Sequence, residues 1–113
     1  MDSGDKNYYH PQDLKDFPKI SEHASDLGKK FFDYLGSAMR AGAISEREKA
    51  LIALAVSTVQ NCPYCIDAYT NKCLSIGLSG EEMMEAIHVG AAINAGITLA
   101  HATQMRKILK KPS

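Results

Sequence analysis

Apolar side chains recur at helical spacing along almost the whole chain, and no segment alternates convincingly with period two. In the segment 21–42, Leu27, Phe31, Leu35 and Met39 follow one another at four-residue steps. This spacing places them on one face of an amphipathic helix. With no strand pattern elsewhere, the sequence predicts an all-α helical bundle.

Two capping boxes mark where later helices begin. Ser45 is followed three residues later by Glu48, and Ser79 is followed at the same spacing by Glu82. In this motif the serine and glutamate side chains each bind a backbone N–H of the other, so the pair starts a helix. The first box opens a segment that is apolar nearly all round, so we expect a buried, central helix.

Proline and glycine set the remaining boundaries. Pro63 suits the first turn of a helix over about 63–76, and Gly77 would end it. Gly42 is a suitable C-terminal stop for the first helix. Within the last helix, Gly96 would be an interruption, because glycine costs about 1 kcal/mol relative to alanine in a helix.

Small side chains gather in the middle of the last helix. A patch of small residues lets another helix approach closely, in the same subunit or in a neighbouring one. The members of this patch are Gly90, Ala91, Ala92, Ala95 and Gly96.

Length and charge exclude several classes of protein. A chain of 113 residues fits a single domain over 1–113, with a loosely ordered N-terminal segment over about 1–19 and a helical core over about 20–110. Thirteen basic and thirteen acidic side chains leave no net charge, so neither a nucleic-acid partner nor an anionic membrane is favoured. The start lacks a signal peptide, and the apolar run at 50–56 is far shorter than the roughly 20 residues that span a bilayer. We therefore expect a cytoplasmic protein.

All three cysteines lie within "NCPYCIDAYTNKC", residues 61–73. In a reducing cytosol such a cluster is more often catalytic or metal-binding than a structural disulfide. On one helix, Cys62 and Cys73 would be roughly 16 Å apart, too far to share a metal ion. The second pair of ligands of a zinc ribbon is also absent from the sequence. The remaining zinc arrangement is the Cys62–Cys65 pair completed by a histidine from elsewhere in the chain. We predict no metal ion and no cofactor.

Redox chemistry requires two thiols within reach of each other, one of them kept as thiolate. Cys62 and Cys65 have this spacing, and they stand at the start of a predicted helix. There, unpaired backbone N–H groups and the helix dipole lower a thiol pKa from about 8.5. A thiolate of this kind attacks peroxides or disulfides, and its neighbour then closes a disulfide. Cys73, near the far end of the helix, is predicted to be a small buried hydrophobe.

The run "EREKALIALAVSTVQNCPYCIDAYTNKC", followed by "GLSGEEMMEAIHVGAAINAG", resembles the alkylhydroperoxidase D-like, or carboxymuconolactone decarboxylase, family over about residues 20–108. The resemblance implies an all-α subunit that assembles into trimers or hexamers. In the peroxidase branch, which the Cys-x-x-Cys motif marks, it implies that Cys65 attacks the hydroperoxide and Cys62 resolves the product as a disulfide. A dithiol protein, thioredoxin-like or lipoyl-bearing, would then regenerate the pair. Decarboxylase members lack the cysteine pair, which disfavours decarboxylation.

The chain departs from the peroxidase pattern at both positions of its proton relay. Where that pattern has a glutamate before the cysteines and a histidine after them, this sequence has Ala50 and Tyr69. Tyr69 lies one turn beyond Cys65, so its hydroxyl would be within reach of the sulfur. With an ordinary pKa near 10 it is a poor base, and a packing role is the alternative.

Two other side chains are candidates for the missing relay. Glu46 lies one turn before Ala50 on the same helix face, although an exposed first-turn glutamate is its simpler interpretation. His88 falls among apolar positions of the last helix and titrates near neutrality, although it also fits a core or interface position.

Two functions follow from the thiol pair. The first is a thiol oxidoreductase that reduces hydroperoxides or exchanges disulfides. The second is a non-catalytic protein that holds a thiophilic ligand, such as arsenite or a soft metal ion, between vicinal thiols. The combination "CPYCIDAYT" also resembles a peroxidase-like branch associated with arsenosugar biosynthesis. A purely structural role for the cysteines is the third possibility.

Overall fold

The computed structural model describes residues 10–112, and every regular element in that range is a helix. This confirms the predicted all-α fold. In chain order the elements are the 3₁₀-helix η2 (Pro11–His23), α1 (Ser25–Met39), α2 (Glu46–Val59), α3 (Pro63–Ser75), α4 (Gly80–Ala100) and α5 (Ala102–Leu109).

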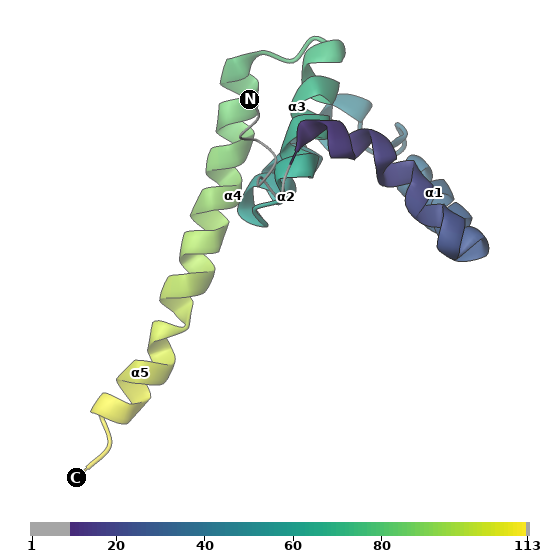
Figure 1. Cartoon of the computed structure of the whole chain (residues 1–113). Coiled ribbons are helices and arrows are strands. Elements are labelled where there is room, and N and C mark those ends of the chain that lie inside the picture. The colour runs from purple at the N-terminus through teal and green to yellow at the C-terminus, as the bar shows by residue number, and fades with distance from the viewer. Residues whose placement is uncertain (1–9, 113) are drawn as a thin grey trace, which may run out of the picture.

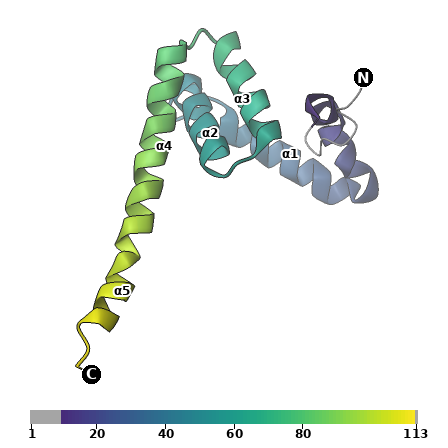
Figure 2. The same cartoon turned by 60° about the vertical axis from the view of Figure 1, so that its left-hand side comes forward.

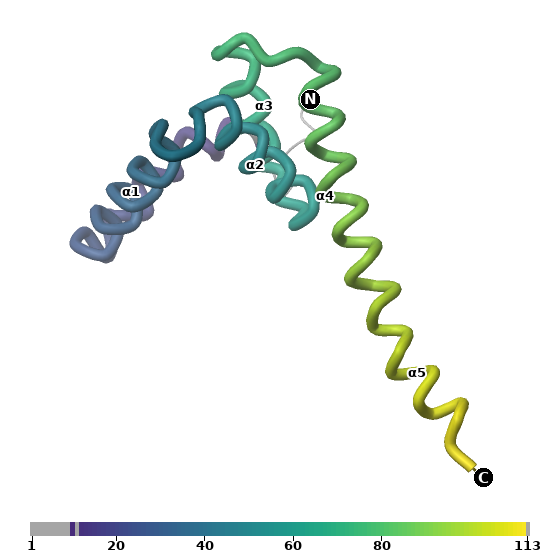
Figure 3. The backbone as a smooth tube through the Cα atoms, turned by 180° about the vertical axis from the view of Figure 1, so that it is seen from behind, coloured from purple at the N-terminus to yellow at the C-terminus, as the bar shows by residue number. Residues whose placement is uncertain are grey.

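Helix α2 is the centre of the fold, because it packs against both α3 and α4. Helix α1 and the α4–α5 arm lead away from the central helices in different directions (Figures 1 and 2). The view from behind shows the same divergence, with α5 at the tip of the long arm (Figure 3). The chain accordingly measures 59 × 37 × 37 Å along its principal axes.

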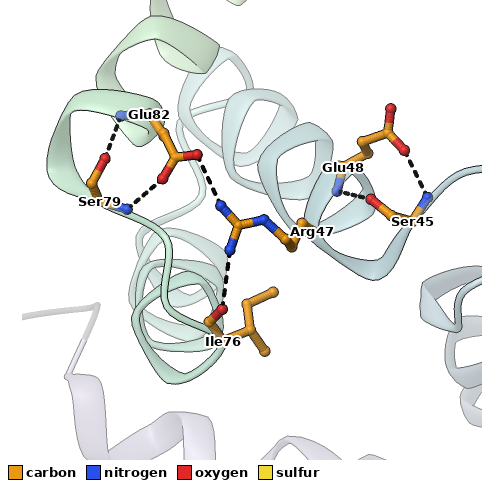
Figure 4. A network of polar contacts seen from close by, with 6 residues as sticks. All are labelled: Ser45, Arg47, Glu48, Ile76, Ser79 and Glu82. Atoms are coloured by element: carbon orange, nitrogen blue, oxygen red, sulfur yellow. Dashed lines mark hydrogen bonds and ion pairs between the residues drawn. The ribbon is translucent and has the colours of Figure 1, made fainter.

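Both predicted capping boxes are confirmed. Ser45 Oγ accepts the Glu48 N–H at 3.0 Å, and Glu48 Oε1 accepts the Ser45 N–H at 2.7 Å. The same exchange joins Ser79 and Glu82 at 3.0 and 2.9 Å (Figure 4). Gly77 ends α3 as predicted, with a positive φ of 84° that favours glycine.

Arg47 joins three helix ends at one end of the domain. Its Nη2 donates to Glu82 Oε2 at 2.9 Å, at the start of α4, and its Nη1 donates to the carbonyl oxygen of Ile76 at 3.3 Å, just beyond α3 (Figure 4). These non-local contacts fix how α2, α3 and α4 meet.

The N-terminal part differs from the prediction. Residues 11–23 form η2, and the first α-helix begins at Ser25 instead of residue 21. Pro18 lies inside η2, where its missing N–H disfavours a regular α-helix. The corner between the two helices is tight, because a Cβ on Gly28 would lie 2.1 Å from Ser21 Oγ. This close approach requires glycine.

Two predicted interruptions also fall elsewhere. Helix α1 ends at Met39 because Arg40 is extended, with ψ 149°, so Gly42 lies beyond the end of the helix. The last helix continues through Gly96 and breaks at His101, since the cost of a helical glycine is too small to end a long helix.

The hydrophobic core is small. Among the described residues, its buried members are Ala50, Leu54, Cys73, Leu78 and Met83. The expected central position of α2 is confirmed, but its burial covers only one side in the single chain, because Ile52 and Val56 remain 52% and 55% exposed. Leu27 on α1 is likewise 68% exposed. Within the small-residue patch, Gly90 packs inside the chain, where a Cβ would lie 3.0 Å from Val59 Cγ2.

Much apolar surface is therefore uncovered. The solvent-accessible surface is 8688 Å², against about 6,100 Å² for a compact monomer of this mass. The radius of gyration is 19.0 Å, against about 13 Å for a compact domain. The segment Gly80–Leu109 also contains an 18-residue stretch with a mean hydropathy of 1.3, so by length and composition it could cross a membrane, whereas the run at 50–56 could not. One such helix is a weak sign of a membrane protein, because helices of soluble proteins pass the same test.

Candidate active site around the cysteine pair

The cysteine pair stands where the chain turns from α2 into α3. Asn61 takes the left-handed conformation with φ 56°, which asparagine tolerates better than most residues. The Cys62 N–H donates to the Ser57 carbonyl oxygen at 3.0 Å, so the turn is closed against the end of α2. Pro63 then occupies the first turn of α3, as the sequence predicts. The turn brings the N-terminus of α3 against the central helix.

Cys62 is the N-cap residue of α3. Its Sγ accepts the backbone N–H of Cys65 at 3.3 Å, the role that a serine or aspartate oxygen usually plays. This N–H and the positive end of the helix dipole both favour a negatively charged sulfur at Cys62. Both thiols of the pair are free and half-buried.

The surroundings of Cys65, in contrast, disfavour a thiolate at its own sulfur. Burial, followed by the hydrogen bond and charge of Cys62, raises the pKa of the Cys65 thiol from 9.0 to about 11. A hydrogen bond from the Ser57 side chain opposes this pKa shift. The low pKa expected for a thiolate at the helix start is therefore not found at Cys65. The backbone N–H of Cys65 is donated to Cys62, so the two sulfurs have different polar environments.

Ser57 is a contact of the thiol pair that the sequence prediction missed. It is buried, with 6% of its surface exposed, and its single O–H can donate either to the Ala53 carbonyl oxygen, at 2.6 Å, or to the Cys65 sulfur. The signal for it was a polar residue three positions after Leu54, on the buried face of α2. It places a hydroxyl beside Cys65.

The two changed relay positions have distinct environments. Ala50 is fully buried, and its carbonyl oxygen accepts a hydrogen bond from the Cys73 thiol, with the oxygen and Sγ 3.6 Å apart. Cys73 is also fully buried, which confirms its predicted core role and raises its pKa. Tyr69 is half-buried, and its pKa is raised by burial and then by the nearby charges of Cys65 and Cys62. Tyr69 is thus near the pair as a protonated O–H group.

The other two relay candidates lie apart from the thiols. Glu46 Oε2 forms an ion pair with Lys72 Nζ at 2.7 Å, so its described partner is a surface lysine on α3. His88 is exposed on α4. Neither side chain lines the cavities beside the cysteines. The structure brings together Cys62, Cys65 and Tyr69 and leaves these two residues outside that group.

Two mainly apolar cavities open beside the pair. The first, of about 330 Å³, lies between η2 and the start of α3 and includes both cysteines in its wall. The second, of about 660 Å³, lies between α1, α2 and α3 and reaches Cys65 and Tyr69. Within residues 10–112, no three histidine, cysteine, aspartate or glutamate side chains gather to hold a metal ion. The pair thus offers two thiols, an adjacent hydroxyl and space for an organic molecule.

A small all-α domain that presents two thiols at the start of a helix is typical of a Cys-x-x-Cys thiol protein. The comparison with family models gives a more specific result, since residues 25–106 match the carboxymuconolactone decarboxylase family. The chain belongs to this family.

Two curated relatives extend the comparison. The chain is 41% identical over 68 residues to "Uncharacterized protein 4 in cox locus" of Paracoccus denitrificans, which covers 60% of this chain and 61% of the relative. It is 32% identical over 85 residues to "Alkyl hydroperoxide reductase AhpD" of Mycobacteroides abscessus, which covers 67% of this chain and 48% of that protein. The chain therefore spans about half to three fifths of the length of these relatives.

Two solved structures share the fold. A protein from Methanobacterium thermoautotrophicum superimposes with a TM-score of 0.72 at 28% identity, over 76% of this chain and 97% of that one. A protein from Thermotoga maritima gives a TM-score of 0.59 at 26% identity, over 84% and 98% of the two chains.

Proposed function

We propose that the protein is a peroxidase-like thiol oxidoreductase, which reduces a hydroperoxide or exchanges with a disulfide through Cys62 and Cys65. The observation that carries the proposal is the Cys65 N–H donated to Cys62 Sγ at 3.3 Å, at the N-terminus of α3. This contact favours a thiolate beside a second thiol, the arrangement that a two-cysteine reaction requires. The similarity to a protein named alkyl hydroperoxide reductase supports the same class of reaction.

In the proposed reaction, a cysteine thiolate attacks the outer oxygen of the hydroperoxide. The O–O bond breaks, the sulfur becomes a sulfenic acid, and the departing alkoxide takes up a proton to become an alcohol. The second thiol then attacks the sulfenic sulfur, forms the disulfide and releases water. An external dithiol protein, thioredoxin-like or lipoyl-bearing, returns two electrons by thiol–disulfide exchange.

The order of the two cysteines is part of the proposal. The family resemblance implies that Cys65 attacks first, whereas the N–H donated to Cys62 and the raised pKa of Cys65 favour Cys62. Tyr69, held near both sulfurs, is suited to donate a hydrogen bond to them or to the departing oxygen. Glu46 and His88 would act only if another conformation or subunit brought them to the site.

We also propose that the working form is a homo-oligomer, a trimer or hexamer as the family resemblance implies. The supporting observation is the apolar surface left uncovered on α1, α2 and α4, including Leu27, Ile52, Val56 and Ile93. Neither a nucleic acid nor a membrane partner is proposed. A cytoplasmic location suits a pair that must stay reduced.

The second candidate is a vicinal-thiol protein that binds arsenite or a soft metal ion without turnover. The observation in its favour is the changed relay, since Ala50 and Tyr69 provide no base that is charged at neutral pH. Trivalent arsenic would be held by the two sulfurs, whose softness matches it.

Thiol counting separates the two functions. We expect hydroperoxide to remove two thiols per chain from the wild type and from Cys73→Ala, with a disulfide mapped between Cys62 and Cys65 by mass spectrometry. Neither Cys62→Ser nor Cys65→Ser should form that disulfide. No thiol loss with peroxide or with a disulfide probe, together with stoichiometric and thiol-dependent arsenite binding, would replace the enzyme proposal with the binding one.

A further inference from the structure

We propose that the cavity between η2 and the start of α3 binds the apolar part of an uncharged organic substrate and directs its reactive end to the cysteine pair. This inference rests on the proposed function and specifies its substrate as a neutral hydroperoxide with an apolar tail. It assigns the choice of substrate to η2.

The cavity has the size and lining of a small-molecule site. Its volume of about 330 Å³ lies at the lower end of the range for ligand pockets. Three apolar side chains of η2 face the thiols across it, namely Leu14, Phe17 and Ile20. Cys62 and Cys65 form part of the opposite wall. A small polar oxidant such as hydrogen peroxide would leave most of this apolar surface uncovered, whereas a hydrocarbon tail would cover it.

Helix η2 is held against the domain by specific contacts. Phe17 packs edge to face against Phe31 and Phe32 of α1, with ring centroids 6.2 and 5.1 Å apart. Tyr64 Oη lies 3.5 Å from Asp13 Oδ2, so the start of α3 also contacts η2. These contacts form a wall with a defined position beside the thiols.

The charges around the cavity disfavour an anionic substrate. Asp13 and Asp16 are the charged side chains among its described lining residues. Lys19 Nζ lies 3.5 Å from Asp16 Oδ1, but both side chains are about two thirds exposed, so this pair is screened and offsets the negative charge only in part. A thiolate at Cys62 would add negative charge on the opposite wall. The arrangement favours a neutral tail over a carboxylate-bearing one.

The wall also lies outside the part of the chain that defines the family. The family match begins at residue 25, whereas η2 spans Pro11–His23. The thiol pair thus belongs to the shared domain, and the surface that would select the substrate precedes it in the chain. This location allows the wall to be altered without touching the thiols.

The test uses alkylating probes, which need no turnover. Rates at Cys62 and Cys65 are measured by mass spectrometry on the full chain with N-cyclohexylmaleimide and N-methylmaleimide. For each cysteine, the rate with the cyclohexyl probe is divided by the rate with the methyl probe. This ratio is then divided by the same ratio measured for the urea-unfolded chain. We expect the folded wild type to prefer the cyclohexyl probe, and Leu14→Ala or Ile20→Ala to reduce that preference about three- to tenfold, the effect of roughly one buried methylene group. Leu109→Ala, which removes a 72% exposed leucine of α5 that does not line the cavity, is the matched control and should keep the preference.

A second pair of probes tests the charge preference. Iodoacetate should react more slowly than iodoacetamide, again relative to the unfolded chain, and Asp13→Asn should reduce this difference. The proposal is overturned if the folded chain has no preference for the cyclohexyl probe, or if the Leu14 and Ile20 variants, with circular dichroism unchanged, keep the preference.

The cavity proposal and the peroxidase proposal can fail separately. A selective but peroxide-inert thiol pair would uphold the cavity and overturn the peroxidase proposal. Rapid oxidation by peroxide without probe selectivity would do the reverse. If both hold, thiol loss with cumene hydroperoxide should exceed that with hydrogen peroxide, and Ile20→Ala should narrow the difference.

Discussion

Replacing Cys62 with serine should leave Cys65 a poorly ionised thiol. In the wild type the pKa of Cys65 is raised from 9.0 to about 11, so about 100-fold less thiolate is present at neutral pH than for an ordinary cysteine. Burial is the first cause, and the hydrogen bond and charge of Cys62 follow. The substitution removes the contributions of Cys62 and retains that of burial. We therefore expect a pKa between 9.0 and about 11 in Cys62→Ser.

The assay is a pH titration of thiolate ultraviolet absorbance, with iodoacetamide rates at each pH. Cys73 is fully buried, so both are measured in a Cys73→Ala background. Cys65→Ser is the matched variant, in which the backbone N–H of residue 65 still donates to the Cys62 sulfur. Its remaining thiol should react faster at pH 7 than that of Cys62→Ser, by on the order of tenfold or more. A Cys65 pKa below about 8 in Cys62→Ser would refute the reasoning, because burial would then not control that thiol.

Four further outcomes follow from the structure. Leu54→Ala, at a position 1% exposed, should lower the free energy of unfolding by about 2–5 kcal/mol in urea titrations; a loss below about 1 kcal/mol would mean that the core relaxes around it. If the Tyr69 hydroxyl donates a hydrogen bond to a thiolate, Tyr69→Phe should slow thiol alkylation about threefold near neutral pH, whereas a role in packing alone would leave the rate unchanged. The pKa of Cys65 is higher in the folded chain than in the unfolded chain, so the thiol's contribution to the free energy of unfolding should be complete below pH 9.0 and be lost as the pH rises toward about 11. Urea midpoints should therefore fall over this pH range, and Cys65→Ser should make that fall smaller. Gly28→Ala should displace η2, since the new Cβ would lie 2.1 Å from Ser21 Oγ, and should reduce the cyclohexyl preference; an unchanged preference would mean that the corner does not position the wall.

Local signals in the sequence were sufficient to predict where the helices that carry the site begin and end. The capping boxes at Ser45 and Ser79 and the stop at Gly77 act through contacts a few residues apart, and the structure has each of them. The position of Cys62 at the start of α3 follows from Pro63 in the same way. These interactions join residues that are close in the sequence, so they can be predicted from the sequence alone.

Non-local contacts were the part that the sequence did not disclose. The ion pair of Glu46 with Lys72 joins residues 26 positions apart, and only the folded arrangement shows that this glutamate has such a partner. Ser57 beside Cys65 and the wall formed by η2 are further contacts of this kind. Periodicity also identifies an apolar face without saying whether the same chain covers it, which is why the exposure of Ile52 and Val56 on the otherwise central α2 was not predicted.

The hydrogen bond from the Cys65 N–H to Cys62 has a consequence for the redox equilibrium. It stabilises a negative sulfur, which exists only while the pair is reduced, so forming the disulfide gives up that stabilisation. Any favourable free energy specific to the reduced form raises the reduction potential, by about 30 mV for each 1.4 kcal/mol. In the proposed reaction, the cap of α3 would therefore make the disulfide more oxidising and easier for a dithiol protein to reduce. If the pair cycles as proposed, the backbone contact that begins α3 would also help to determine how readily its disulfide is reduced.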